Sequence, residues 1–228
     1  NVVVDAAVTT GTSSTVDGVN AEAGAITVTA GTNGNISGTG SLVTGSATVA
    51  VAGLADTAQG GNITLSGNEV SKDGATAFTV TFGTASGATT SNTQGLLAVT
   101  TDGSGAAGEI RITSGAALRL GVLNTTDADA TTVSVVTTGG ALTVASASAL
   151  DIDNVTLTGA TGLTVSNTLG LGSLTASVSG VGDLTVSNTI TTADSATGAT
   201  GAVGLTTANG NVVVDAAVTT GTSSTVDG

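Results

Sequence analysis

Side chains that could carry out catalysis are scarce in this sequence. The chain has no His and no Cys, and its three basic residues are Lys72, Arg111 and Arg119. Imidazole and thiol groups, which are the commonest general bases and strong nucleophiles, are therefore missing. Ser and Thr are abundant, but nothing in the sequence could activate their hydroxyls as a catalytic triad does. We therefore predict that the protein is not an enzyme.

Two pairs of aspartates are the candidate metal ligands. Asp127 and Asp129 form one pair, and Asp151 and Asp153 form the other. Leu150 and Ile152 alternate with the second pair and are expected to face inward, so both of its carboxylates point to the same outer side of a strand. Calcium prefers such oxygen ligands, yet the glycine-rich calcium nonapeptide and the EF-hand loop are absent. We expect solvated carboxylates, with structural calcium as the alternative and no other cofactor.

Two asparagines stand at equivalent places in a short repeat. Asn167 and Asn188 occupy the same position in two copies of the hexapeptide LTVSNT, at 163–168 and 184–189. Asn tolerates the left-handed conformation that turns require. Stacked amide side chains also form hydrogen-bonded ladders along the axis of repetitive β-structures. We therefore predict a structural role for both residues, at turns that lie one above the other.

The only aromatic residues are Phe78 and Phe82. With Val80 they lie on one face of the alternating stretch ATAFTVTF, residues 75–82. Alternation with period two places these three side chains on the same side of a strand. We predict that both rings fill the core.

The elements that position these residues are short strands. A recurring pattern consists of a Gly, one variable residue and then an apolar–polar–apolar triplet. Alternating triplets rich in Thr and Val and bounded by turn formers are typical of β-strands, and both residues form helices poorly. We predict an all-β chain with strands in 24–30, 61–67, 108–114, 140–146, 162–168, 182–189 and 210–216.

In the second half these strands recur with a fixed spacing. Leu142, Leu163 and Leu184 begin equivalent strands at equal intervals, with a period of 21 in the sequence. Further apolar pairs between them indicate about three short strands in each period. Such a unit cannot bury its apolar face alone and must stack on copies of itself. The pattern therefore predicts a parallel β-solenoid whose core contains these three leucines.

A much longer repeat frames the chain. Residues 1–18 and 211–228 have the same sequence, NVVVDAAVTTGTSSTVDG. This identity predicts a tandem array in which 1–210 is one complete repeat and 211–228 begins the next. Division of 210 by 21 predicts about ten to eleven coils of roughly 21 residues, and ten coils at about 4.8 Å give an axial period near 48 Å.

The coil sequences resemble a known class of surface proteins. Strings such as GALTVASASALDI and GDLTVSNTI are similar to the repeats of filamentous-haemagglutinin-type adhesins and autotransporter passenger domains. The resemblance covers most of 96–228 and is fainter before it. It implies a right-handed parallel β-helix, located outside the cell on a bacterial surface.

Charge and composition limit the partners. Three basic and 16 acidic residues give a net charge of −13, which disfavours nucleic acid because its binding requires neutralisation of phosphates. No apolar run is long enough to insert this segment in a membrane. We expect neighbouring identical repeats as end-to-end partners, laterally associated copies, and a glycan or cell-surface ligand.

Three hypotheses follow. The first is a non-catalytic structural repeat of a giant extracellular fibre or stalk. The second is an adhesin whose solenoid face binds a glycan, a surface or a neighbouring cell. The third is a pair of β-sandwich domains, which would require a pseudo-repeat of about 105 residues and a buried Trp or Tyr. Neither is present, and we therefore favour the first.

Overall fold

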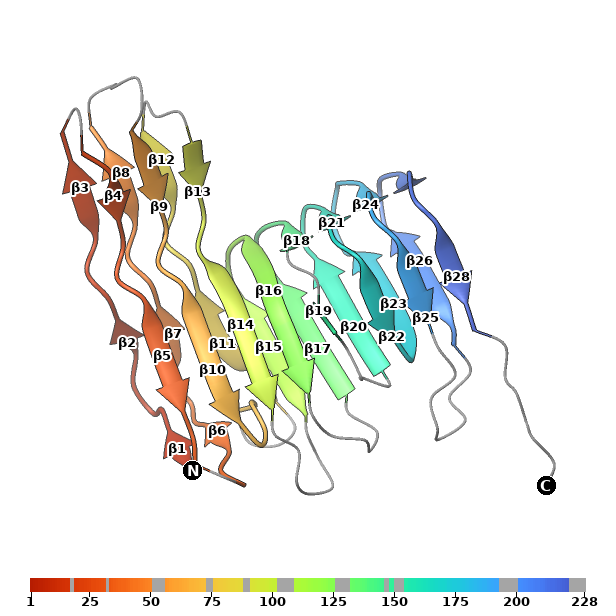
Figure 1. Ribbon diagram of the computed structural model, residues 1–228, viewed down its shortest axis with the longest axis horizontal. Helices are drawn as coiled ribbons and strands as arrows, with labels where there is room; N and C mark the ends of the chain where they lie inside the picture. Colours follow the sequence, from red (N-terminus) through yellow and green to blue (C-terminus); the bar gives the residue numbers. More distant parts are fainter. Residues whose placement is uncertain are drawn as a thin grey trace.

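The computed structural model confirms a parallel β-solenoid. It describes residues 1–16, 19–31, 33–50, 56–72, 76–87, 91–101, 109–125, 132–145, 148–149, 154–192 and 201–221. Within these ranges there is no helix, and the strands pair in parallel between successive coils. Figure 1 shows the coils stacked side by side from the N-terminal to the C-terminal end.

Two long sheets form opposite walls of the solenoid. Sheet I consists of β2 (Val8–Thr9), β7 (Ser41–Val43), β11 (Phe78–Thr81), β15 (Ile110–Ser114), β17 (Thr132–Thr137), β20 (Asn154–Gly159), β23 (Ser173–Val178) and β26 (Val203–Thr207). Sheet II consists of β5 (Ile26–Thr29), β10 (Ile63–Gly67), β14 (Leu96–Thr101), β16 (Leu118–Thr125), β18 (Leu142–Val144), β21 (Leu163–Val165), β24 (Leu184–Val186) and β27 (Val212–Val214).

Smaller sheets complete the cross-section. The C-terminal coils are closed by sheet III, which consists of β19 (Ser148–Ala149), β22 (Leu169–Leu171), β25 (Ile190–Thr192) and β28 (Val218–Thr220). The N-terminal coils carry two wing sheets, one of β3 (Ser13–Thr15), β8 (Ala47–Val49) and β12 (Ala85–Gly87), the other of β4 (Ala21–Glu22), β9 (Thr57–Gln59) and β13 (Ser91–Thr93). The pair β1 (Val2–Val3) and β6 (Ile36–Ser37) leads through bridges at Val70 to Ile110 in sheet I.

The predicted stack with the short period is present in the second half. Leu142 pairs with Leu163, and Leu163 pairs with Leu184. All three side chains are fully buried. The alternation places apolar residues inside and Thr outside, because successive side chains of a strand point to opposite faces. The three leucines are part of one continuous apolar core that extends from Val4 to Ile190.

The number of coils differs from the prediction. The two long sheets have eight strands each, so the described chain forms eight coils rather than the ten to eleven expected for one repeat. Paired residues in the N-terminal coils are farther apart in the sequence, as in Ile63 with Leu97 and Leu42 with Val80. These coils are longer because each adds strands to the two wing sheets, which rise above the rest of the solenoid in Figure 1. Seven to eight coils at about 4.8 Å shorten the expected period to about 34–38 Å.

Both phenylalanines lie in the core. Phe78 in β11 is fully buried, and Phe82 just after it is 3% exposed. Phe78 pairs with Ile112 of the next coil. Both rings therefore lie in the continuous apolar core, within the N-terminal coils, as predicted.

Glycines at the corner before sheet II account for the pattern that precedes several of its strands. A Cβ added at Gly61 would lie 2.0 Å from the Gly24 carbonyl oxygen, and one at Gly95 would lie 1.9 Å from the Gly61 oxygen. Near the other end, a Cβ at Gly210 would lie 1.9 Å from the Gly182 oxygen. The corner before sheet II thus brings the backbone of one coil directly against the next. At these three positions a larger residue would have to displace the backbone of the neighbouring coil.

We expect Gly95→Ala to lower the free energy of unfolding by about 1–3 kcal/mol, because the added methyl must displace backbone rather than a mobile side chain. The matched control is Gly170→Ala in β22, where a Cβ meets nothing within 4 Å. That variant is expected to change stability by no more than about 0.5 kcal/mol. Urea unfolding followed by circular dichroism measures both, and equal effects would show that the corner is not closely packed.

Candidate functional site: the open ends of the solenoid

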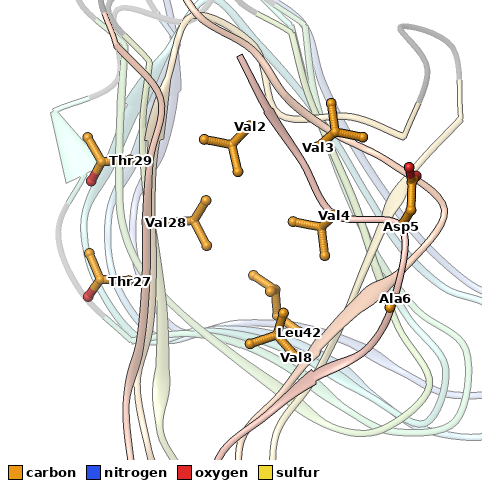
Figure 2. A pocket seen from close by; sticks show the side chains of 10 residues that line it. All are labelled: Val2, Val3, Val4, Asp5, Ala6, Val8, Thr27, Val28, Thr29 and Leu42. Atoms are coloured by element: carbon orange, nitrogen blue, oxygen red, sulfur yellow. The ribbon is translucent and has the colours of Figure 1, made fainter.

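The N-terminal end of the core is an open, apolar hollow. Its volume is about 680 Å³. Figure 2 shows Val2, Val4 and Val28 pointing into it, with Leu42 at its floor. The complete lining is Val2, Val3, Val4, Asp5, Ala6, Val8, Thr27, Val28, Thr29 and Leu42. Most of the lining residues belong to 1–18, the segment that recurs at the other end of the chain.

The C-terminal end of the core is also uncovered. Val212 pairs with Leu184, and Val214 pairs with Val186. Their partners are fully buried, so both valines point toward the interior, yet they are 43% and 48% exposed. No further coil covers them in the described chain. An exposed core of this kind, bordered by unpaired strand edges, requires either a cap or another coil.

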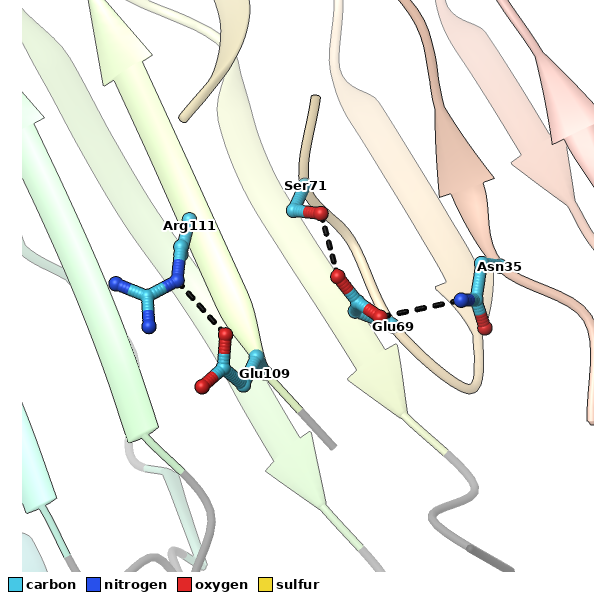
Figure 3. Close-up of polar contacts among 5 residues, drawn as sticks. All are labelled: Asn35, Glu69, Ser71, Glu109 and Arg111. Carbon is cyan, nitrogen blue, oxygen red and sulfur yellow. Dashed lines mark hydrogen bonds and ion pairs between the residues drawn. The ribbon is translucent and has the colours of Figure 1, made fainter. Parts of the chain in front are cut away.

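A column of polar residues runs along the edge of sheet I beside the N-terminal hollow. Its members are Asn1, Asn35, Glu69 and Glu109, each of which precedes an apolar residue of the paired strands. Asn1 Oδ1 accepts a hydrogen bond from the Asn35 backbone amide at 3.0 Å, and Asn35 Nδ2 donates to Glu69 Oε2 at 3.1 Å. The Ser71 hydroxyl donates to the other Glu69 oxygen (Figure 3). The column therefore links successive coils through side chains as well as through backbone.

The column ends in an ion pair. Arg111 Nε donates to Glu109 Oε2 at 2.8 Å, and both side chains are about a quarter exposed (Figure 3). The hydrogen bond that Arg111 donates to Glu109 raises the pKa of Arg111. Burial opposes this change, and the negative charges of Glu109 and Glu69 add to it. Ile110 and Ile112 alternate with these two residues and are fully buried, so the ion pair lies on the outer side of the strand.

We expect Arg111→Gln to lower the free energy of unfolding by about 1 kcal/mol or less, since exposed ion pairs contribute little. A raised Arg pKa means that the stabilisation is present below the ordinary pKa and is lost only as pH rises through the folded-state pKa. The effect should therefore be constant near neutral pH. A double-mutant cycle with Glu109→Gln measures the coupling. A coupling well above about 1 kcal/mol would mean that the pair is more than a surface contact.

The predicted asparagine turns lie between sheets II and III. Asn167 Oδ1 accepts from the Thr168 amide at 2.9 Å, and Asn188 Oδ1 accepts from the Thr189 amide at 2.9 Å. The bond between the two coils runs from the Thr168 hydroxyl to Asn188 Oδ1, at 3.2 Å. The equivalent positions are thus stacked, but a threonine hydroxyl connects them where an amide-to-amide bond was expected. An amide-to-amide bond does occur between Asn68 Nδ2 and Asn35 Oδ1, at 3.3 Å.

The structure brings no metal-binding cluster together in the part of the chain that it describes. Within those residues, no three His, Cys, Asp or Glu side chains are close enough to hold a metal ion. The calcium candidates Asp127, Asp129, Asp151 and Asp153 lie outside the described residues. Arg119 Nη1 donates a hydrogen bond to the Gln94 carbonyl oxygen at 2.8 Å.

The open ends and the polar column were not identified as sites from the sequence alone. The polar column has a sequence spacing of 34 residues between Asn1, Asn35 and Glu69. This spacing differs from the period of 21 in the second half. The sequence feature that could have indicated the open ends is the repeated segment. Residues 1–18 and 211–228 have the same sequence, and they lie in the two open coils.

Two further findings bear on function. None of the described residues form a helix long and apolar enough to span a membrane. Comparison with protein-family models, with curated proteins and with solved structures finds no match to this chain.

Proposed function

We propose that this chain is a structural, non-catalytic repeat of a long β-solenoid that forms an extracellular fibre or stalk on a bacterial surface. The observation that carries the proposal is that the repeated segment lies at both open ends of the core. Residues 1–18 and 211–228 have the same sequence, and each copy supplies the strands at one of these ends. Stacking of one repeat on the next covers both ends without a cap.

The architecture suits a load-bearing filament. Adjacent coils are joined by rows of backbone hydrogen bonds that run along the axis, as in Leu163 to Asp183 and Leu184 to Asn211. A pull along the axis is therefore shared by many bonds at each coil. The net charge of −13 per chain favours repulsion between neighbouring filaments and keeps long polymers soluble. Three basic residues and two Phe offer few cleavage sites to proteases of trypsin or chymotrypsin specificity.

An adhesin remains the second hypothesis, but the described surface gives it little support. A lateral binding face would present a contiguous apolar or aromatic patch. Away from the ends, the large exposed apolar residues of the described chain stand singly, as Val122 and Val181 do.

The proposal is tested by the lengths of chains that contain one, two and four copies of residues 1–210. Negative-stain electron microscopy is expected to show rods of constant width whose length increases by about 34–38 Å per copy. Chains that form compact particles, or beads joined by flexible links, would contradict a continuous fibre.

A further inference from the structure

The repeated segment occupies two different places in one molecule. In the N-terminal copy, β1 pairs with β6 and β2 pairs with β7 of sheet I. In the C-terminal copy, β27 pairs with β24 of sheet II and β28 pairs with β25 of sheet III. The same sequence therefore stacks on residues 36–43 at one end and on residues 184–192 at the other.

Both copies have the same local shape and orientation. Each has a first strand, a bend at Ala6 or Ala216, and a second strand that begins at the equivalent Val8 or Val218. The first-strand residues Val2 and Val212 pair with the inward residues Ile36 and Leu184. The second-strand residues Val8 and Val218 pair with the inward residues Leu42 and Ile190. The inward face is the same in both places.

The two sets of backbone hydrogen bonds use different groups of the segment. In the N-terminal copy, the amides of the even-numbered Val2, Val4 and Thr10 donate to residues 35, 37 and 43. In the C-terminal copy, the odd-numbered residues are used. Leu184 and Ile190 donate to the carbonyls of Asn211 and Ala217, and the amides of Asp215 and Gly221 donate to residues 186 and 192. Alternate residues of a parallel strand direct their N–H and C=O groups to opposite neighbours, so none of these bonds competes with another.

The first residue of the segment shows the same complementarity in its side chain. Asn211 donates both its backbone amide, at 2.8 Å, and its Nδ2, at 3.3 Å, to Asp183 Oδ1. Asn1 uses its Oδ1 to accept from the Asn35 amide at 3.0 Å. One asparagine can make all three bonds at once. The polar column then continues from Asp183 through this asparagine to Asn35.

We infer that the two placements are the two sides of one junction between consecutive repeats. The segment lies between residues 184–192 of the preceding repeat and residues 36–43 of its own. This inference rests on the proposed function and specifies how the repeats join. Val212 and Val214, which are about half exposed at the C-terminal end, are buried at the junction by the following coil.

The junction gives each repeat a non-integral number of turns. Seven coil steps lead from Val2 through Ile36, Val70, Ile110, Val133, Val155 and Leu174 to Val203 in sheet I. The chain then crosses to sheet II before the segment recurs at Val212. Sheets II and III of one repeat therefore continue into sheet I of the next, and successive repeats are rotated about the axis by the step between two faces. The remaining edges of the long sheets, β26 and β5, are then free to pair across the junction.

Engineered disulfides test both sides of the junction in one molecule, because the chain has no cysteine of its own. The test protein is a chain of two consecutive repeats. Thr191→Cys and Thr219→Cys probe the lower side, where these residues pair. Val213→Cys in the same segment and Ser37→Cys in the second repeat probe the upper side, because Val3, the equivalent of Val213, pairs with Ser37. Paired Cα atoms about 4.8 Å apart are within disulfide range.

We expect both disulfides in the same molecule after mild oxidation, identified by peptide mapping with mass spectrometry. The negative control carries only Thr191→Cys in the first repeat and Ser37→Cys in the second. These positions are two coils apart, about 9.6 Å or more, so no disulfide should form between them. The 228-residue chain with Thr191→Cys and Thr219→Cys alone shows whether the substitutions permit folding. If no molecule carries both disulfides although the rods lengthen with repeat number, the junction is wrong and the fibre stands. If the rods do not lengthen, the fibre itself is wrong.

Discussion

Replacing Phe78 by alanine is expected to lower the free energy of unfolding of the N-terminal coils by about 3–5 kcal/mol. Phe78 is fully buried in β11, between β7 and β15 of sheet I. The neighbouring core residues are aliphatic, apart from Phe82, and are held in their own coils by the backbone ladders. They cannot move far enough to fill the space of the ring, so a cavity remains.

Urea unfolding of the variant, followed by circular dichroism, measures the loss. Val181→Ala serves as the control, because Val181 is 77% exposed and its truncation should change stability by less than about 0.5 kcal/mol. Because solenoids are stabilised by contacts between neighbouring coils, the N-terminal coils should unfold first in the Phe78 variant. A change as small as that of the control would show that the ring does not fill the core.

The second large effect depends on the number of repeats. Val214→Asp is expected to be tolerated in the 228-residue chain, where the side chain is 48% exposed and the carboxylate reaches water. In a chain of two repeats joined as proposed above, the following coil would cover this position. An unpaired buried carboxylate should then lower the free energy of unfolding by about 3–5 kcal/mol or separate the two repeats.

The matched control is Val213→Asp, one position earlier. Val213 pairs with Thr185 on the outer face, so its substitution should have little effect in either chain. Thermal and urea unfolding of the four proteins gives the comparison. If Val214→Asp has the same effect in one repeat and in two, no coil covers the C-terminal end.

The sequence predicts the C-terminal coils because their chemistry is regular. Leu163 and Leu184 face inward from strands of the same length, and a Thr follows each of them on the outside. Parallel stacking requires equivalent residues to recur at the coil length, so the period of 21 can be read directly. The same reasoning places both phenylalanines inside.

The wing sheets could not be predicted in this way. β3 is Ser-Ser-Thr, β13 is Ser-Asn-Thr, and the wing interior is formed by small residues such as Ala47 and Ala58. Such short strands of polar or small residues have no apolar alternation and look like loops. Their structure depends on pairing with the coils above and below, which local sequence does not reveal. The predicted number of coils was too large because these extra strands lengthen each N-terminal coil.

The polar column depends on the same long-range pairing. Asn1 and Asn35 meet because Val2 pairs with Ile36, and their spacing of 34 in the sequence is set by the wing strands between them. The regular period of the second half would have placed Asn1 beside a different residue. The repeated segment was evident from the sequence, but its two different positions became visible only in the strand pairings.

The axial repeat of a filament built from many copies of residues 1–210 tests the central claim most directly. Fibre diffraction or cryo-electron microscopy should show a strong meridional spacing of about 4.8 Å and a rise of about 34–38 Å per copy, with successive copies rotated about the axis. A period of about 80 Å or more without the spacing of about 4.8 Å, as expected for linked sandwich domains, would contradict a continuous solenoid.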